Sequence, residues 1–360
     1  MYKMFRFKPY ILLVFAIWWS TLIYGQNHIN FRNISPILNN KNIPVYKTVQ
    51  DKLGNIWMLS SSGILLFDGY DHKLIEKKII FPKWHSNDAI KGLVKDGNDD
   101  IWLTSDFGLI SKYHSDTGLF EDFGPSLNNA TINTICVKGK NLWLASKTGI
   151  IFRYTKSKTD SITTVYNKNL PIKDIKNIEI IEPNDFFIST ENGKVFNYSI
   201  DTKELNELVG PFTDYPEKLI LVSDQNYRLW IGTETQGLFV YDLAQKKFIQ
   251  NTFFKEEKFN VHKEMFLSLL CDKDGYIWGG TDGGGMYKIN SNTGDIDLFT
   301  KQKFNSFSLG NNTILDINED NHKNIWICAK YGNLYVLPSV NSNISYHSGS
   351  ANKTPERILS

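Results

Sequence analysis

Few residues of this chain have the types and spacing that catalysis or metal binding requires. The seven histidines are scattered, and none forms a metal-binding pair such as His-Glu-x-x-His. Asp272–Gly275 resembles the start of a calcium loop, but a third acidic ligand and the distal Glu are absent. Gly283–Gly285 resembles a phosphate-binding loop, yet no Lys-Ser/Thr follows it. No nucleophile elbow or paired-carboxylate motif occurs, so the sequence predicts no catalytic residue, metal or cofactor.

Side chains that could recognise a polar ligand recur at one place in a repeated unit, together with one segment between two units. They are acids, lysines, one glutamine and aromatic residues, namely Asp106, Phe107, Lys147, Glu191, Glu234, Gln236, Asp282, Lys330 and Tyr331, with Lys83-Trp84-His85 between units. Aromatic faces and a few convergent polar groups suit a small ligand site. We expect a saccharide to stack on Trp84 and on Phe107 or Tyr331, with the acids as hydroxyl acceptors. The alternative is that Trp84 only fills a junction between units.

The unit that positions these side chains occurs seven times. A hydrophobic residue precedes an aromatic slot, Ser or Thr follows three places later in six units, and Gly follows six or seven places later in all. The slot is filled by Trp57, Trp102, Trp143, Phe187, Trp230, Trp278 and Trp326, at intervals of 45, 41, 44, 43, 48 and 48 residues. This period with β-type residues is typical of propeller blades. The chain is therefore predicted to be an all-β, seven-bladed β-propeller with four strands per blade.

Each recurring residue of the unit has a structural role. Five units carry an Asp six places before the slot, where a short carboxylate can cap a tight turn: Asp51, Asp96, Asp224, Asp272 and Asp320. The slot residue should pack between adjacent blades. The later Gly should bracket a hairpin that opens on the same side as the loops between blades. The unit around Phe187 is the weakest, because it lacks both the Trp and the Asp.

The two ends of the chain differ from the repeats. Residues 1–26 have a basic start and a 15-residue apolar run, which predicts a secretory signal peptide; an uncleaved anchor is the alternative. No other stretch is long and apolar enough to span a membrane, so we expect a periplasmic or secreted protein. The propeller should occupy residues 27–343. Residues 344–360 read as the start of a further, truncated repeat. For ring closure, we expect 29–33 rather than 344–347 to pair with the last blade.

Charge and cysteines exclude some partners. Without Lys3, Arg6 and Lys8 the formal charge changes from +2 to −1, so no basic stripe is left to bind nucleic acid. The three cysteines are too few and too widely spaced for a disulfide framework, and we expect them to be buried as small apolar residues.

The units 51–69 and 272–287, with their shared pattern D-x-x-G-x-I-W, resemble two-component regulator propeller repeats. The resemblance covers residues 28–360, and 304–320 also resembles the family's linker into the next repeat. It implies the periplasmic sensor region of a Bacteroidetes hybrid two-component system that detects glycans, without catalysis. Such proteins usually carry a second propeller, a membrane span and a kinase, none of which follows here. The remaining sensor domains or a second propeller are therefore expected partners. A stand-alone secreted propeller that binds carbohydrate or protein, or a propeller lyase or glycosidase, is the alternative.

Overall fold

Seven four-stranded antiparallel sheets form the unit of the chain that begins at Phe31. The structure is a computed structural model that describes residues 29–38, 41–85, 88–123, 131–139, 141–155, 161–166, 172, 174–181, 185–212, 217–250, 253–254 and 261–339. The predicted signal peptide 1–26 and the segment 344–360 lie outside the described residues. Ile29 and Asn30 lie outside the unit that begins at Phe31 and form no helix or strand.

The blades follow one another along the chain, each listed here from its innermost strand outward. Blade one has β4 (Val45–Gln50), β5 (Ile56–Ser60), β6 (Gly63–Phe67) and β7 (His72–Ile75). Blade two has β8 (Ile90–Lys95), β9 (Ile101–Ser105), β10 (Ile110–His114) and β11 (Leu119–Asp122). Blade three has β12 (Ile132–Lys138), β13 (Asn141–Ser146), β14 (Ile151–Thr155) and β15 (Ser161–Tyr166). Blade four has β16 (Ile175–Ile181), β17 (Asp185–Thr190), β18 (Val195–Ser199) and β19 (Leu205–Glu207).

The last three blades repeat this order. Blade five has β20 (Ile220–Ser223), β21 (Arg228–Gly232), β22 (Leu238–Asp242) and β23 (Lys247–Phe248). Blade six has β24 (Phe266–Cys271), β25 (Tyr276–Thr281), β26 (Met286–Asn290) and β27 (Ile296–Phe299). Blade seven has β28 (Ile314–Glu319), β29 (Ile325–Ala329), β30 (Asn333–Leu337) and β1 (Arg32–Asn33). Outside the blades lie the hairpin β2 (Ile37–Leu38) and β3 (Lys41–Asn42), the short helix α2 (Lys77–Ile80) and the 3-10 turn η3 (Lys330–Gly332).

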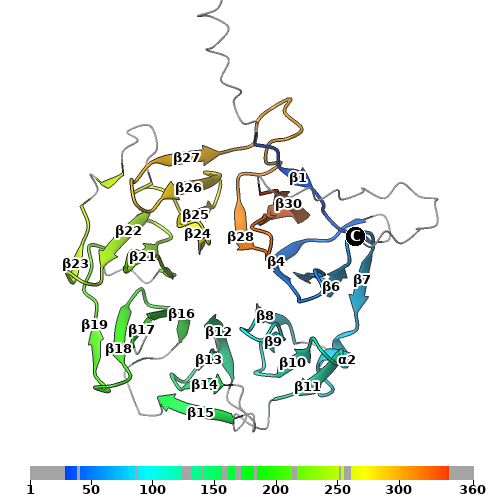
Figure 1. Cartoon of the computed structure of the whole chain (residues 1–360), viewed down its shortest axis with the longest axis horizontal. Helices are drawn as coiled ribbons and strands as arrows, with labels where there is room; N and C mark the ends of the chain where they lie inside the picture. The colour runs from blue at the N-terminus through cyan, green and yellow to red at the C-terminus, as the bar shows by residue number, and fades with distance from the viewer. Residues whose placement is uncertain are drawn as a thin grey trace, which may run out of the picture. The chain divides into compact units, whose positions relative to one another are not determined.

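The seven sheets close into a ring. Each innermost strand contacts the innermost strands of both neighbouring blades, including β28 with β4 (Figure 1). The predicted all-β, seven-bladed fold is thus confirmed, and the weak unit around Phe187 is a complete four-stranded blade. The hairpin glycines all have positive φ, between 75° and 126°, which explains why this position is glycine in every unit: Gly63, Gly108, Gly149, Gly193, Gly237, Gly285 and Gly332.

The slot residues form the core between blades. Every Trp in the slot is at most 3% exposed and packs with residues of the following blade. In the five units with a turn Asp, the indole Nε1 donates to that carboxylate over 2.7 to 3.0 Å. The other carboxylate oxygen accepts two backbone N–H groups of the turn, for example those of Leu53 and Asn55 in blade one. One Asp therefore fixes both the turn and the Trp beneath it.

Blade three shows what the missing Asp changes. Its β12–β13 turn is shorter, with Lys138 paired directly with Asn141. Trp143 still fills the slot at 3% exposure, but its Nε1 has no hydrogen-bond partner among the described residues. Apolar packing is therefore enough to place the Trp between the blades, and the hydrogen bond from the indole to the turn Asp adds to that packing.

The N-terminal strand closes the ring. In β1, Arg32 pairs with Val336 and Asn33 with Tyr335, and the next N–H, of Ile34, donates to Leu334. The expectation that the N-terminal segment completes blade seven is confirmed for residues 32–33. The competing segment 344–347 lies outside the described residues.

We predict that deleting residues 29–35 lowers the thermal midpoint and promotes association, because it exposes the outer edge of β30. Calorimetry and light scattering measure the two effects. Arg32→Ala is the matched control, since it keeps the backbone ladder. A shortened chain that melts like the parent and stays monomeric would contradict this role of β1.

Candidate ligand-binding face and cavities

The hairpins after the slot strands and the loops between blades lie on one side of the ring, as expected. In six blades a hairpin N–H donates to a carbonyl just before the blade's innermost strand, as Asp106 does to Ala89 and Lys330 to Thr313. In blade five the side chain of Glu217 takes this place and accepts the N–H of Thr235. We call this side, which carries the residues predicted to bind ligand, the hairpin face.

Two aromatic side chains of the hairpin face are largely exposed. Phe107 of blade two is 61% exposed, and Tyr331 of blade seven is 76% exposed. Tyr331 has a left-handed backbone with φ of 64°, and the Nζ of Lys330 lies 5.6 Å from its ring centre. Such rings can stack against an apolar ligand face.

Trp84 is not fully solvent-facing. It is half-buried at the junction of blades one and two, stacked on Phe81 with ring centres 5.7 Å apart. The Nζ of Lys77, in α2, lies 5.0 Å from the centre of the Trp84 ring. His85 beside it is exposed. The residue therefore fills the junction and keeps part of its surface open.

Two predicted acids, Glu191 and Glu234, line one cavity between blades four and five. The cavity measures about 360 Å³ and is also lined by Lys176, Glu217 and Lys218. The ammonium of Lys176 lies 2.6 Å from Glu191 and lowers the pKa of that exposed carboxyl by a hydrogen bond and by its charge. Glu217 is only 5% exposed, and its Oε1 has no hydrogen-bond partner among the described residues. A hydroxyl or amine donor would satisfy it.

The other predicted site residues are spread around the face and have local roles. Asp106 pairs with Lys91 of its own blade. Asp282 of blade six accepts from the hydroxyl of Thr313 over 2.9 Å, which links it to blade seven. Lys147 is exposed and Gln236 half-buried. The structure therefore brings Glu191 and Glu234 together, whereas Asp106, Phe107, Asp282 and Tyr331 lie on hairpins of three different blades.

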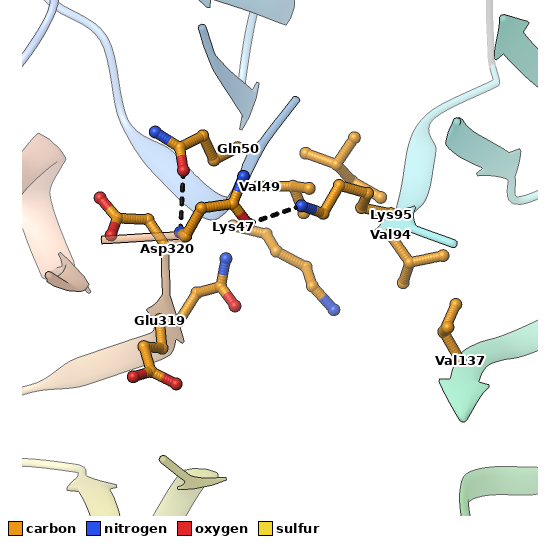
Figure 2. A pocket seen from close by; sticks show the side chains of 11 residues that line it. Lys47, Val49, Gln50, Val94, Lys95, Val137, Glu319 and Asp320 are labelled. Atoms are coloured by element: carbon orange, nitrogen blue, oxygen red, sulfur yellow. Dashed lines mark hydrogen bonds between the residues drawn. The ribbon is translucent and has the colours of Figure 1, made fainter. Parts of the chain in front are cut away.

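A second cavity lies on the opposite side of the ring, between the innermost strands of four blades. It measures about 240 Å³ and is lined by β4, β8, β12, β28 and the turn after β28, with Lys47 extending into it (Figure 2). Asn321 connects the walls that β4 and β8 form. Its backbone N–H donates to the side-chain oxygen of Gln50, and its side-chain oxygen accepts from the Nζ of Lys95 over 2.9 Å. The lining mixes lysines with acids and has no aromatic ring among the described residues.

Charged groups on the innermost strands tie neighbouring blades together. Glu179 of blade four accepts the hydroxyl of Ser223 over 2.5 Å, and the Nζ of Lys138 lies 3.5 Å from it. Burial raises the pKa of Glu179, partly offset by Lys138. On β28, burial raises the pKa of the Asp316 carboxyl to about 6. Burial also raises the pKa of all three cysteine thiols, so none is activated as a nucleophile.

No sequence pattern points to Lys176, Glu217 and Lys218, because they lie outside the residues that recur in each unit and meet only in the folded chain. Among the described residues no group of three or more His, Cys, Asp or Glu side chains could hold a metal ion. Within the same part of the chain, no helix has the length and apolar character of a membrane span.

Comparisons with known proteins give a sequence relative and many structural relatives. No protein-family model matches the chain. Histidine kinase P4 of Formosa agariphila is 26% identical over 209 residues, which cover 56% of this chain and 14% of the kinase. The chain thus spans a small part of that relative.

Among solved structures, the extracellular domain of the hybrid two-component system BT4673 from B. thetaiotaomicron superposes with a TM-score of 0.67 at 24% identity. The match covers 86% of this chain and 40% of that one. Streptogramin B lyase gives a TM-score of 0.63 at 16% identity, covering 87% and 99%. Propellers of sensors and of an enzyme thus share this fold, and the fold alone does not decide function. By architecture the chain is a seven-bladed β-propeller that resembles the extracellular domains of two-component sensors.

Proposed function

We propose that this chain is an extracytoplasmic ligand-sensing propeller of a two-component sensor, that its ligand is a glycan or oligosaccharide, and that it performs no catalysis itself. One observation carries the proposal. Sequence comparison leads to a histidine kinase and structure comparison leads to the extracellular domains of two-component systems, and both matches cover much of the propeller. The whole sensor, with its membrane span, kinase or second propeller, belongs to this proposal as the partner of the chain.

The ligand would bind on the hairpin face. Phe107 and Tyr331 offer exposed rings there, Trp84 offers the open part of its surface, and His85 stands beside it. Glu234 and Asp282 supply carboxylate oxygens, and Lys330 supplies a donor. Rings for stacking together with a few hydrogen-bonding groups suit a sugar, whose rings have apolar faces and hydroxyl edges.

We predict that Tyr331→Ala and Phe107→Ala each weaken the affinity for a bound oligosaccharide about tenfold, because each removes one stacking ring. Trp84→Ala should act in the same direction. Calorimetric titration against a panel of oligosaccharides measures the change. Leu53→Ala is the matched control, since Leu53 is 75% exposed on a turn at the opposite side of the ring. Unchanged affinity in all three aromatic variants would place the ligand elsewhere.

The two alternative functions, a stand-alone binding protein and an enzyme, predict different experimental results. A stand-alone secreted binder would bind the same ligand, but the coding sequence would not continue into a kinase; reading the genomic sequence directly downstream separates the two. A lyase or glycosidase would convert the oligosaccharide, which product analysis after incubation with purified protein detects.

A further inference from the structure

Blade four breaks the repeat in a way that opens a cavity toward blade five. The cavity measures about 330 Å³ and is lined by Phe187, the residue in the aromatic slot of blade four. It is distinct from the cavity of Glu191 and Glu234, with which it shares no lining residue. Its size falls at the lower end of the range for ligand clefts, about 300–1,000 Å³.

Two substitutions in one row of the sheet account for the space. In blades two, three and six the slot Trp pairs across the strands with a Lys or Arg, as in Trp102–Lys112 and Trp278–Lys288. In these blades the cation lies 5.2 to 5.7 Å from the indole centre and covers the ring. In blade four the same row reads Phe187, Asn197 and Asn206. A smaller ring and a shorter side chain therefore replace the Trp and the cation that fill the row in blades two, three and six.

The facing wall belongs to blade five. In the junction of blades one and two, Trp57 contacts Tyr113 with ring centres 4.6 Å apart. Tyr241 of blade five is at the position equivalent to Tyr113 of blade two. Each tyrosine pairs with the residue before the slot Trp on one side and with a Phe of the outermost strand on the other. Phe187 makes no ring contact with Tyr241 in the part of the chain that the structure describes. One side of the Tyr241 ring thus borders the cavity.

The lining combines stacking rings with neutral hydrogen-bonding groups. Tyr227 stands at the rim, 47% exposed, on a left-handed backbone with φ of 59°. Asn197 and Asn206 are direct cross-strand partners, so their amides lie side by side. The Oδ1 of Asn197 is buried and has no hydrogen-bond partner among the described residues. Asp185 adds a carboxylate and Lys246 an ammonium group.

We propose that this cavity binds one neutral sugar residue. Tyr227 and Tyr241 face the apolar side of the ring, and the amides of Asn197 and Asn206 bond its hydroxyls as donors and acceptors. A ligand hydroxyl supplies the missing donor for Asn197, which removes the cost of a buried unpaired oxygen. The inference rests on the proposed function only in taking a saccharide as the ligand; it assigns a second site, away from the residues of the hairpin face.

The test fills the cavity with the residues that fill it in other blades. The double variant Phe187→Trp with Asn197→Lys recreates the row of blades two and six, and Asn206→Ala removes one amide from an exposed position. The probes are glucose, galactose, mannose, xylose, fucose and N-acetylglucosamine, measured by saturation-transfer NMR and titration on the wild type and variants. Circular dichroism and thermal melting check that each variant is folded.

We expect at least one of these sugars to bind the wild type, to lose detectable binding in the double variant, and to bind about tenfold more weakly to Asn206→Ala. Leu53→Ala, on an exposed turn of blade one, should leave this binding unchanged. A folded double variant that binds like the wild type overturns the inference, and so does the absence of binding by every sugar of the panel. Binding lost in Tyr331→Ala but kept in the double variant also overturns it, while it supports the proposed hairpin-face site.

Discussion

Replacing Trp230 with alanine is expected to lower the free energy of unfolding by about 3–5 kcal/mol, the usual loss for a large buried aromatic side chain. Trp230 is fully buried between blades five and six, where its ring lies 6.1 Å from that of Phe253. Its removal leaves a cavity in that junction and an unpaired Asp224 oxygen. Urea unfolding of the purified propeller measures the change.

The matched comparison uses phenylalanine in place of alanine. Trp230→Phe removes the indole donor to Asp224, whereas Trp143→Phe removes an indole whose Nε1 has no partner among the described residues. The first substitution should therefore cost more than the second. Equal costs would show that the bond to the turn Asp adds no stability, and a Trp230→Ala variant that unfolds like the wild type would contradict the packing between blades.

Asp96→Ala is expected to lower the free energy of unfolding by about 2–4 kcal/mol, because it leaves several buried donors without an acceptor. Asp96 is 3% exposed and accepts the N–H groups of Asn98 and Asp100 and the indole of Trp102 over 2.8 to 3.1 Å. Chemical denaturation at neutral pH measures the loss.

The control is another carboxylate of the same repeat region. The side chain of Asp116 is 70% exposed and makes an ion pair with Lys52, so Asp116→Ala should cost no more than about 1 kcal/mol. If Asp96→Ala proves as mild as Asp116→Ala, the turn Asp is only a local turn residue and does not anchor the Trp.

Most of the fold can be predicted from the sequence of the repeated unit. A Trp, a hydroxyl residue and a Gly at fixed spacing occur in nearly every unit, and they determine the strand order of each blade. The sequence predicts a backbone cap for the turn Asp, and its constant distance of six residues from the Trp is the signal for the indole hydrogen bond. Closure by residues 32–33 could be expected because a propeller must pair its last edge.

The candidate sites are less visible in the sequence because they form between repeats. The hairpin face could be predicted, since its residues occupy one position of the unit. Glu217 lies outside the residues that recur in each unit, and its role in lining a cavity depends on how blades four and five pack together. The sequence shows Phe187 as a departure from the repeat, but the space beside it depends also on Asn197 one strand away and on Tyr241 in the next blade.

Native mass spectrometry of the purified propeller with the oligosaccharide panel tests the central claim most directly, because one spectrum reports both binding and conversion. A glycan-sensing propeller should give a complex whose mass is that of the protein plus the intact oligosaccharide, with the free sugar unchanged after prolonged incubation. Shortened or unsaturated sugar products would show an enzyme instead. The absence of any complex across the panel would contradict a glycan-sensing propeller.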